Sequence, residues 1–188
     1  MAISDGTTPL PDLIGRCSVS GVPLVVWPDG APSDLGPASV PVVVGANLGS
    51  TLADALLTHP ASMPTDADTV RVAWTEPGTP YKKGTAIAFP EPVGMAWARK
   101  RSNNRYVAHR DDEWAAAMTM VEGPDGHRTV GVSDHGPHLE ALILAAVGLV
   151  AAEGAFEPGI QSAASAMPLV LAEARNLELD VAVWRSSI

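Results

Sequence analysis

The longest apolar stretch of the chain covers residues 141–152, where no side chain carries a charge or a hydrogen-bonding group. A Gly-Pro pair precedes it and Gly154 follows it, which is the punctuation typical of a helix. A helix that is apolar on all sides packs inside a fold. About 12 residues rise only ~18 Å, too short to cross a hydrocarbon core of ~30 Å. We therefore predict a central core helix in which Leu142 and Val147 are fully buried.

From about residue 65 onwards, apolar and polar residues alternate in several short runs, which is the period of β-strands. Asn103-Asn104 interrupts one pair of runs, and a Gly-Pro-Asp-Gly sequence interrupts another. Both are good hairpin turns because Asn and Gly tolerate positive φ. The runs predict strands at residues 69–75, 85–89, 93–101, 105–110, 114–122 and 127–133.

The chain that follows the apolar stretch predicts a second helix and a last strand. The helix is expected to start after Gly159 and to extend to Ala174, with a kink or break at Pro168. Alternation over residues 179–184 predicts a closing strand.

The first 60 residues have a different pattern. Residues 1–39 are rich in Pro, Gly, Ser and Asp, and only two short apolar runs interrupt them; the second, at residues 21–27, predicts a strand. The unbroken valines of residues 40–45 predict a strand buried on both faces. A Gly-containing turn and a helix at residues 52–57 follow, and a proline ends the helix.

Strands and helices that are segregated along the chain are typical of α+β folds. We therefore predict an α+β protein whose sheet is mainly antiparallel and has helices packed on one face. The strand, turn and helix of the first part predict a short α/β remnant in front of this sheet. The predicted domains are residues 1–60 and residues 61–188.

Composition narrows the classes of function. The chain has 188 residues, 46% of them hydrophobic, which is enough for a sizeable core. Its net charge of −9 argues against a general binder of nucleic acid or of an anionic membrane. Cys17 is the only cysteine, so no internal disulfide forms and a reducing compartment is expected. The N-terminal residues have no basic or apolar signal region, so the expected location is the cytoplasm.

The turn between the valine strand and the next helix is a candidate anion site. Residues 44–50 place two glycines, Asn47 and Ser50 at a helix start, where free N–H groups can hold an anion. The alternative is a plain turn with a helix cap. The spacing is not the dinucleotide fingerprint, and the chain has no phosphate-binding loop, so no cofactor is predicted.

A polar cluster next to the core helix contains Asp134, His135 and His138. These side chains could form a metal site or an acid–base pair. The favoured alternative is a helix cap by Ser133 or Asp134, because two histidines three positions apart are weak evidence and no further ligand is identifiable. We therefore keep the three residues as a candidate ligand site and assign no metal.

Positive charge is concentrated in one hairpin and one loop, which is uneven for an acidic protein. Such a cluster could bind a phosphate or a carboxylate, and the alternative is a solvated hairpin tip. Arg110 is kept as a candidate residue for a small anion. The cluster consists of Lys82, Lys83, Arg99, Lys100, Arg101, Arg105 and Arg110.

Several segments resemble saccharopine-dehydrogenase-like oxidoreductases. Residues 42–48 and 52–56 are similar to the crossover out of the nucleotide-binding domain in that family, and residues 68–73 to the first strand of its second domain. Residues 138–150 and 153–159 resemble the long Ala-rich helix of the second domain and the segment after it. Dihydrodipicolinate-reductase-like and homoserine-dehydrogenase-like enzymes share this layout.

The resemblance covers roughly residues 40–175 and implies the second domain of such an enzyme, which binds substrate or forms dimers. In the family a complete Rossmann domain precedes this region. Here about 45 residues precede it, too few for two βαβαβ halves. No catalytic residue of the family can be matched. The resemblance therefore implies a domain with most of its nucleotide-binding half missing.

Three functions remain open from the sequence. The first is an auxiliary domain that binds a small ligand or a partner, or forms a homodimer, without its own nucleotide site. The second is an oxidoreductase component completed by a separate nucleotide-binding chain. The third is a metal hydrolase that uses the Asp134 cluster.

A homo-oligomer is expected because two helices cannot cover all the apolar side chains of the predicted sheet. The alternative is that residues 1–60 fold back over that face. The side chains that motivate this expectation are Trp74, Met95, Trp97, Trp114, Met118 and Met120.

Overall fold

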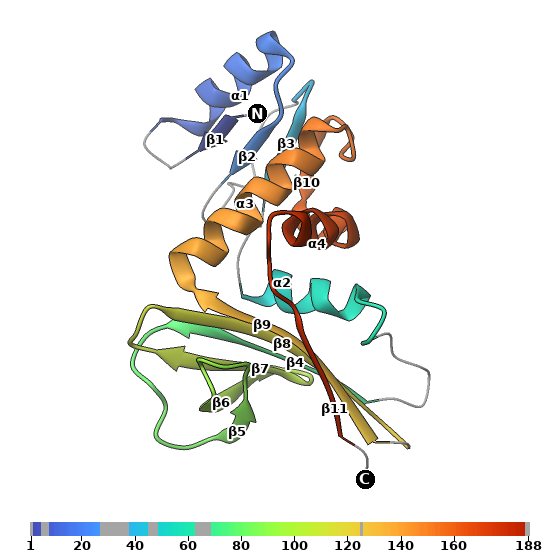
Figure 1. Ribbon diagram of the computed structural model, residues 1–188. Coiled ribbons are helices and arrows are strands. Elements are labelled where there is room, and N and C mark those ends of the chain that lie inside the picture. The colour runs from blue at the N-terminus through green and yellow to red at the C-terminus, as the bar shows by residue number, and fades with distance from the viewer. Residues whose placement is uncertain are drawn as a thin grey trace. The chain divides into compact units, whose positions relative to one another are not determined.

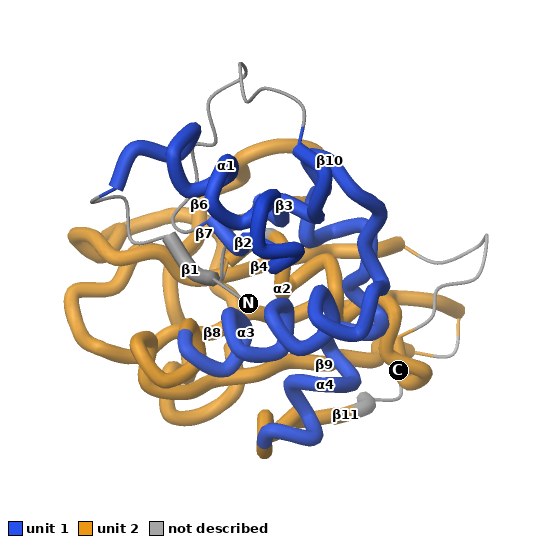
Figure 2. Tube along the Cα trace, turned by 90° about the horizontal axis from the view of Figure 1, so that it is seen from above, with its two compact units in different colours: residues 1–47, 141–177 blue, residues 48–140, 178–188 orange. Residues whose placement is uncertain are grey.

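The computed structural model describes residues 2–4, 8–26, 38–44, 49–62, 69–124 and 126–186. The chain divides into two compact units (Figure 2). Unit 1 comprises residues 1–47 and 141–177, and unit 2 comprises residues 48–140 and 178–188. Unit 1 contains a small parallel sheet, and unit 2 contains a larger, curled and mostly antiparallel sheet. The predicted α+β class is confirmed.

Unit 1 is built on four parallel strands in the order β1-β2-β3-β10 (Figure 1). Helix α1 and the part of α3 that belongs to this unit lie on opposite faces of the sheet (Figures 1 and 2). The elements are β1 (Ala2–Ser4), α1 (Leu10–Ser20), β2 (Leu24–Val26), β3 (Pro41–Val44), α3 (Gly136–Ala152), β10 (Gly159–Ser162), the 3₁₀ helix η2 (Ala163–Ala166) and α4 (Met167–Asn176).

The valine run forms a central strand, as predicted. Val42 and Val43 point to opposite faces of the sheet, and both are fully buried. On one face, Val42 belongs to a cluster with Ile14 and Cys17 of α1. The only cysteine is therefore a buried, free thiol that serves as a core side chain.

Helix α1 covers only the first of the two short apolar runs, where no helix was predicted, whereas the second run contains β2, as predicted. The prolines of this segment are compatible with a helix because Pro9 is its N-cap and Pro11 is in its first turn, where an N–H has no intrahelical acceptor. Gly21 ends the helix with φ of 64°. The prolines and the glycine that suggested irregular structure in the sequence thus lie at the two ends of a helix.

The predicted core helix is α3, and the prediction for Val147 is confirmed because this side chain is fully buried. The prediction for Leu142 is wrong, since it is only partly buried, and Leu149, seven positions later on the same side, is 40% exposed. The helix buries one stripe instead of its whole circumference, although its sequence has no polar side. The stripe consists of Leu139, Ile143, Ala146, Val147, Val150 and Ala151.

The segment after Gly159 differs from the prediction. It forms strand β10 before any helix, because Ile160 and Gln161 pair in parallel with β3. This pairing joins residues more than 100 positions apart and has no local signal. The predicted break at Pro168 is confirmed, because α4 begins there with the proline in its first turn.

Unit 2 is a seven-stranded sheet in the order β11-β9-β8-β4-β7-β6-β5 (Figure 1). Its described neighbours are antiparallel except for β4 and β7, which are parallel. Both predicted hairpins are confirmed: Asn104 has φ of 53°, and Gly123 pairs with Gly126. The strands are β4 (Thr69–Pro77), β5 (Thr85–Ala88), β6 (Met95–Ser102), β7 (Arg105–Arg110), β8 (Trp114–Gly123), β9 (Gly126–His135) and β11 (Ala182–Ser186).

One face of this sheet, which we call the outer face, packs against α2 (Ser50–Ala55) and the 3₁₀ helix η1 (Leu56–Thr58). The Thr119 hydroxyl donates a hydrogen bond of 2.6 Å to the carbonyl of Ala53. The Trp74 indole lies so close to Gly49 that a Cβ there would be 2.3 Å from Cδ1 of the ring. Large side chains of the outer face thus fit directly against the helix.

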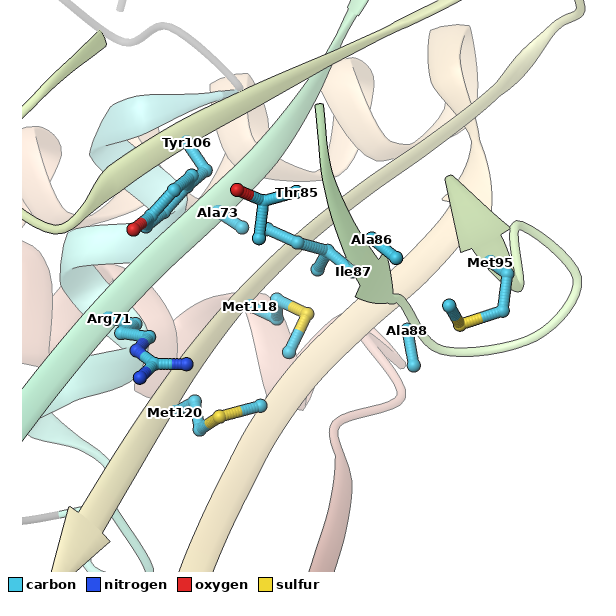
Figure 3. A pocket seen from close by; sticks show the side chains of 10 residues that line it. All are labelled: Arg71, Ala73, Thr85, Ala86, Ile87, Ala88, Met95, Tyr106, Met118 and Met120. Carbon is cyan, nitrogen blue, oxygen red and sulfur yellow. The ribbon is translucent and has the colours of Figure 1, made fainter. Parts of the chain in front are cut away.

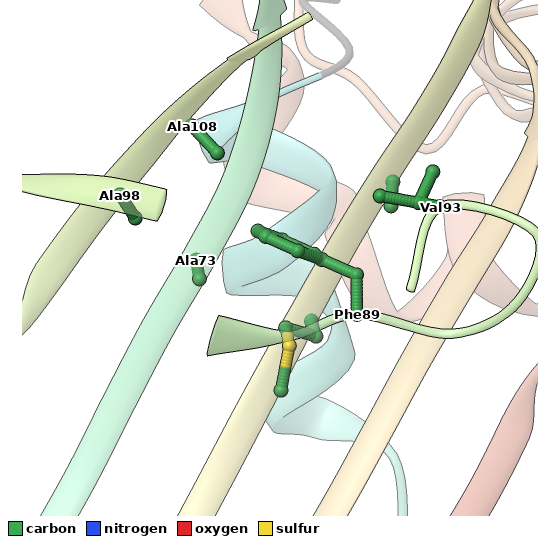
Figure 4. Packing of buried hydrophobic residues seen from close by; sticks show 7 residues of the cluster. Ala73, Phe89, Val93, Ala98 and Ala108 are labelled. Atoms are coloured by element: carbon green, nitrogen blue, oxygen red, sulfur yellow. The ribbon is translucent and has the colours of Figure 1, made fainter. Parts of the chain in front are cut away.

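The opposite face, which we call the inner face, is covered by the segment that follows β5 and folds back over the sheet. Phe89 and Val93, which follow β5, are buried against it together with Met118 (Figure 4). Pro90 lies over Gly131: a Cβ added to Gly131 would be only 2.8 Å from Cγ of Pro90. The sheet positions under this cover are small, and this gives the returning segment room. They are Ala73, Ala98, Ala108 and Ala116.

Candidate functional site

The predicted anion site at residues 44–50 falls mostly outside the described chain. Asn47 lies outside the described residues. Ser50 is the first residue of α2, but its side chain is not among those described. This helix has six residues, with Gly49 at its N-cap.

The polar cluster next to α3 forms two separate pairs. Nδ1 of His138 lies 2.7 Å from Oδ2 of Asp134, and Nε2 of His135 lies 2.6 Å from Oε2 of Glu113. Glu113 was not among the predicted residues because it is 22 positions away in sequence. Among the described residues, no three His, Cys, Asp or Glu side chains come together as metal ligands. The pairs are exposed to solvent, and such pairs contribute about 0–1 kcal/mol.

Arg110 has a structural partner on each side. Its guanidinium bonds both carboxylate oxygens of Asp112 and donates to the carbonyl of Val93 at 3.2 Å. The hydrogen bond between the two side chains raises the pKa of Arg110 and lowers the pKa of Asp112. Arg110 therefore holds the segment that contains Val93 and covers the inner face. Its positive charge already has a counter-ion in Asp112.

The other arginines of the basic cluster are also occupied. Arg101 lies 3.0 Å from Glu76, and Arg105 makes two contacts of 2.8 Å with Asp54. Arg99 lies over the ring of Tyr81, with its Cζ 4.4 Å from the ring centroid. These carboxylates come from β4 and α2, so Arg101 and Arg105 already have counter-ions within the protein.

A second polar network joins the loop after β4 to β7. The Tyr81 hydroxyl lies 2.9 Å from Nε2 of His109, and the two rings are stacked with centroids 4.4 Å apart. Glu76 lies 3.9 Å from the same nitrogen and accepts a hydrogen bond of 2.9 Å from the Trp74 indole. The network borders a shallow cavity of about 190 Å³. The hydrogen bond and stacking fasten the 77–84 loop to the sheet.

A mainly apolar pocket of about 230 Å³ lies on the inner face of the sheet in unit 2 (Figure 3). It lies between β5, which curls over the sheet, and strands β4, β7 and β8. We call it the inner-face pocket. Its lining consists of Arg71, Ala73, Thr85, Ala86, Ile87, Ala88, Met95, Tyr106, Met118 and Met120.

The strand alternation explains this lining. The inner side of β4 carries Arg71 and Ala73, and the inner side of β8 carries Met118 and Met120. On β7, Tyr106 is the residue that pairs with Ala73. Met118 and Met120 are two positions apart, so the sequence indicated that they share a face. The return of β5 over that face depends on non-local packing, and no sequence signal revealed it.

The chain matches no family model and no curated protein. The resemblance to saccharopine-dehydrogenase-like oxidoreductases stays a prediction from the sequence segments. None of the helices in the described part of the chain is long and apolar enough to cross a membrane.

Proposed function

We propose that this chain is a small-ligand-binding module and that the inner-face pocket is its binding site. The observation that carries the proposal is a concave, mainly apolar space with few polar groups, which is the usual character of a ligand site. It lies on strands rather than on loops, and rigid elements hold binding groups more accurately.

The volume of the pocket limits the size of the ligand. An engineered apolar cavity of about 150 Å³ accommodates benzene, whereas sites for drug-sized ligands occupy about 300–1,000 Å³. At about 230 Å³, the pocket fits a ligand larger than benzene and smaller than a nucleotide or a typical drug.

The chemistry of the lining favours binding over catalysis. Arg71 and Tyr106 are the titratable groups among the described residues that line the pocket. The residue types that most often transfer protons, His, Glu and Asp, do not occur in this lining. The pocket thus offers groups that can orient a ligand and few groups for acid–base chemistry.

The proposed role agrees with the auxiliary domain that the family resemblance implies. Dinucleotides bind in open α/β sheets at the point where the strand order reverses. The described strands of unit 1 follow one another without a reversal, in the order β1-β2-β3-β10. This order supports a domain without its own nucleotide site, and calorimetric titration with NADH should give no dissociation constant in the low micromolar range or tighter.

An oxidoreductase component completed by a separate chain is the second candidate. The parallel strands and flanking helices of unit 1 favour it, because nucleotide-binding domains share this architecture. A separate nucleotide-binding chain that forms a stable complex with this protein and restores NADH binding would support this candidate over an independent module.

Self-association is also part of the proposal. Of the side chains that motivated it, Trp74 and Met118 are buried within the protein. Trp97 on β6 and Trp114 on β8 are 47% and 39% exposed and remain for a second copy. Light scattering at micromolar concentration should give at least a dimer mass, and a monomer mass would contradict this part.

Thermal unfolding in the presence of toluene tests the proposed site. A ligand that binds only the folded protein raises its Tm, and at ten times its Kd the expected rise is roughly 3–6 °C for a chain of this size. Met120→Trp should fill the pocket and abolish the rise. Leu169→Trp, at an exposed position of α4, is the matched control and should retain it. Equal responses of the two variants would contradict the proposal.

A further inference from the structure

We propose that the inner-face pocket selects a small monocarboxylic acid whose body is a single ring or a short branched chain, with its carboxylate bound by Arg71 and Tyr106. This inference rests on the proposed function and assigns the chemical class of the ligand. Its basis is the uneven distribution of polar and apolar groups along the pocket.

The two titratable groups of the lining lie on the same side of the pocket. Figure 3 shows the Arg71 guanidinium and the Tyr106 hydroxyl at the same end, with Met95 and Ala88 at the other. The hydroxyl of Tyr106 makes no hydrogen bond with any described residue. A donor at the rim of an apolar space is ready to bind an acceptor on a ligand.

Arg71 keeps donors for a ligand although it has a protein partner. One terminal nitrogen lies 3.1 Å from Glu122, and both side chains are about half exposed, at 48% and 47%. A guanidinium has five N–H donors in a planar fork, and a single carboxylate contact leaves other donors unoccupied. Hydrogen bonds between Arg and a carboxylate are about twice as strong as neutral ones.

The other end of the pocket suits an apolar group. Away from Arg71, the lining consists of Ile87, Ala88, Met95 and Met118 (Figure 3), and methionine adapts its shape to irregular ligands. Because a cavity of about 150 Å³ holds benzene, a pocket of about 230 Å³ has room for a ring and one attached carboxylate.

Glu122 gives the inference a second, opposite test. Its carboxylate competes with a ligand carboxylate for the same guanidinium. Removing its charge should make Arg71 a better site for an anion, whereas removing Arg71 should make it a worse one. A purely apolar pocket would respond to neither change.

Isothermal titration of the full chain with benzoate and with benzamide measures the selectivity. Benzamide has nearly the same shape and no charge. Benzoate should bind at least about 10-fold more tightly, and Arg71→Met should remove that advantage, because a hydrogen bond to a charged group is worth about one to two powers of ten in affinity. Arg71→Lys keeps the charge without the fork and should retain part of it. Glu122→Gln should bind benzoate several-fold more tightly.

The outcomes separate this inference from the proposed function. If toluene stabilises the protein but benzoate and benzamide bind equally, or if Arg71→Met leaves the benzoate affinity unchanged, the carboxylate specificity is wrong and the pocket remains a ligand site. If neither toluene nor benzoate binds, both proposals are wrong. Thermal unfolding of each variant without ligand confirms that it is folded.

Discussion

The two faces of the seven-stranded sheet are covered in different ways. On the outer face, large side chains such as Trp74 fit directly against α2, and Gly49 allows close contact. On the inner face, the central sheet positions are alanines, and the chain covers them with Phe89 and Val93 from its own return. A separate helix packs closely against the outer face. On the inner face, the segment after β5 packs over the centre of the sheet, and a pocket remains beside that segment.

This difference explains why the candidate ligand site is on the inner face. A cover made of one strand and one loop cannot fill the space over every strand it crosses. The space that remains is lined by the flexible side chains of Met118 and Met120 and by β5. The comparison predicts that changes under the inner cover affect both stability and ligand binding, whereas changes on the outer face affect stability alone.

The largest expected effect comes from removing the main side chain of the inner cover. Phe89 is 4% exposed and belongs to the inner cluster. Phe89→Ala should lower the free energy of unfolding by about 3–5 kcal/mol, because it removes buried area and leaves a cavity. Urea unfolding followed by tryptophan fluorescence measures this change. A loss below about 1 kcal/mol would show that the returning segment is not packed as described.

Each face of the sheet has one glycine in close contact with a neighbouring side chain: Gly131 on the inner face and Gly49 on the outer face. Replacing each glycine by alanine should show which face affects ligand binding. Gly131→Ala should cost about 1–3 kcal/mol, because its Cβ would displace Pro90 on the inner face, and it should also weaken toluene binding. Gly49→Ala should cost a similar amount through Trp74 on the outer face and leave toluene affinity unchanged. Equal effects of both variants on ligand affinity would contradict the assignment of the pocket to the inner face.

The smallest expected effect concerns the ion pair that fastens the inner cover. The hydrogen bond from Arg110 lowers the pKa of Asp112, so its stabilisation is complete above the ordinary carboxyl pKa of about 4 and is lost as the pH falls through the lowered value. Asp112→Asn should destabilise the protein by at most about 1 kcal/mol at pH 7, because the Asp112 side chain is 42% exposed and solvent screens its charge.

Unfolding curves at several pH values measure that difference between parent and variant. The difference should stay constant above about pH 5 and shrink below about pH 4. A difference that grows as the pH falls would have the wrong sign for this ion pair.

The sequence predicted most of unit 2 because its strands carry local signals. Alternation and turn residues located both hairpins, and Asn104 has the positive φ that its turn requires. The same reasoning failed for β10 and α1. Strand β10 is defined by pairing with β3, far away in sequence, and the prolines of α1 occupy the only helix positions where they are tolerated.

The candidate site was less predictable than the fold. The sequence showed a basic cluster but not its partners, because Glu76 is 25 positions from Arg101 and Asp54 is 51 positions from Arg105. It also indicated an apolar sheet face, from which we expected self-association. The return of β5 and Phe89 over that face requires contacts that alternation does not encode. For the same reason, Arg71 and Tyr106 were not recognised as site residues.

The most direct test of the central claim uses the methionines as reporters. Met118 and Met120 line the inner-face pocket, whereas Met167 begins α4 in unit 1. A methyl NMR spectrum of the full chain with ¹³C-methyl methionine, recorded during titration with toluene, follows all three. A ligand in the pocket predicts saturable shifts for Met118 and Met120 with Met167 unchanged. Unchanged signals of Met118 and Met120 at saturating toluene, or equal shifts of all three, would contradict a ligand site on the inner face.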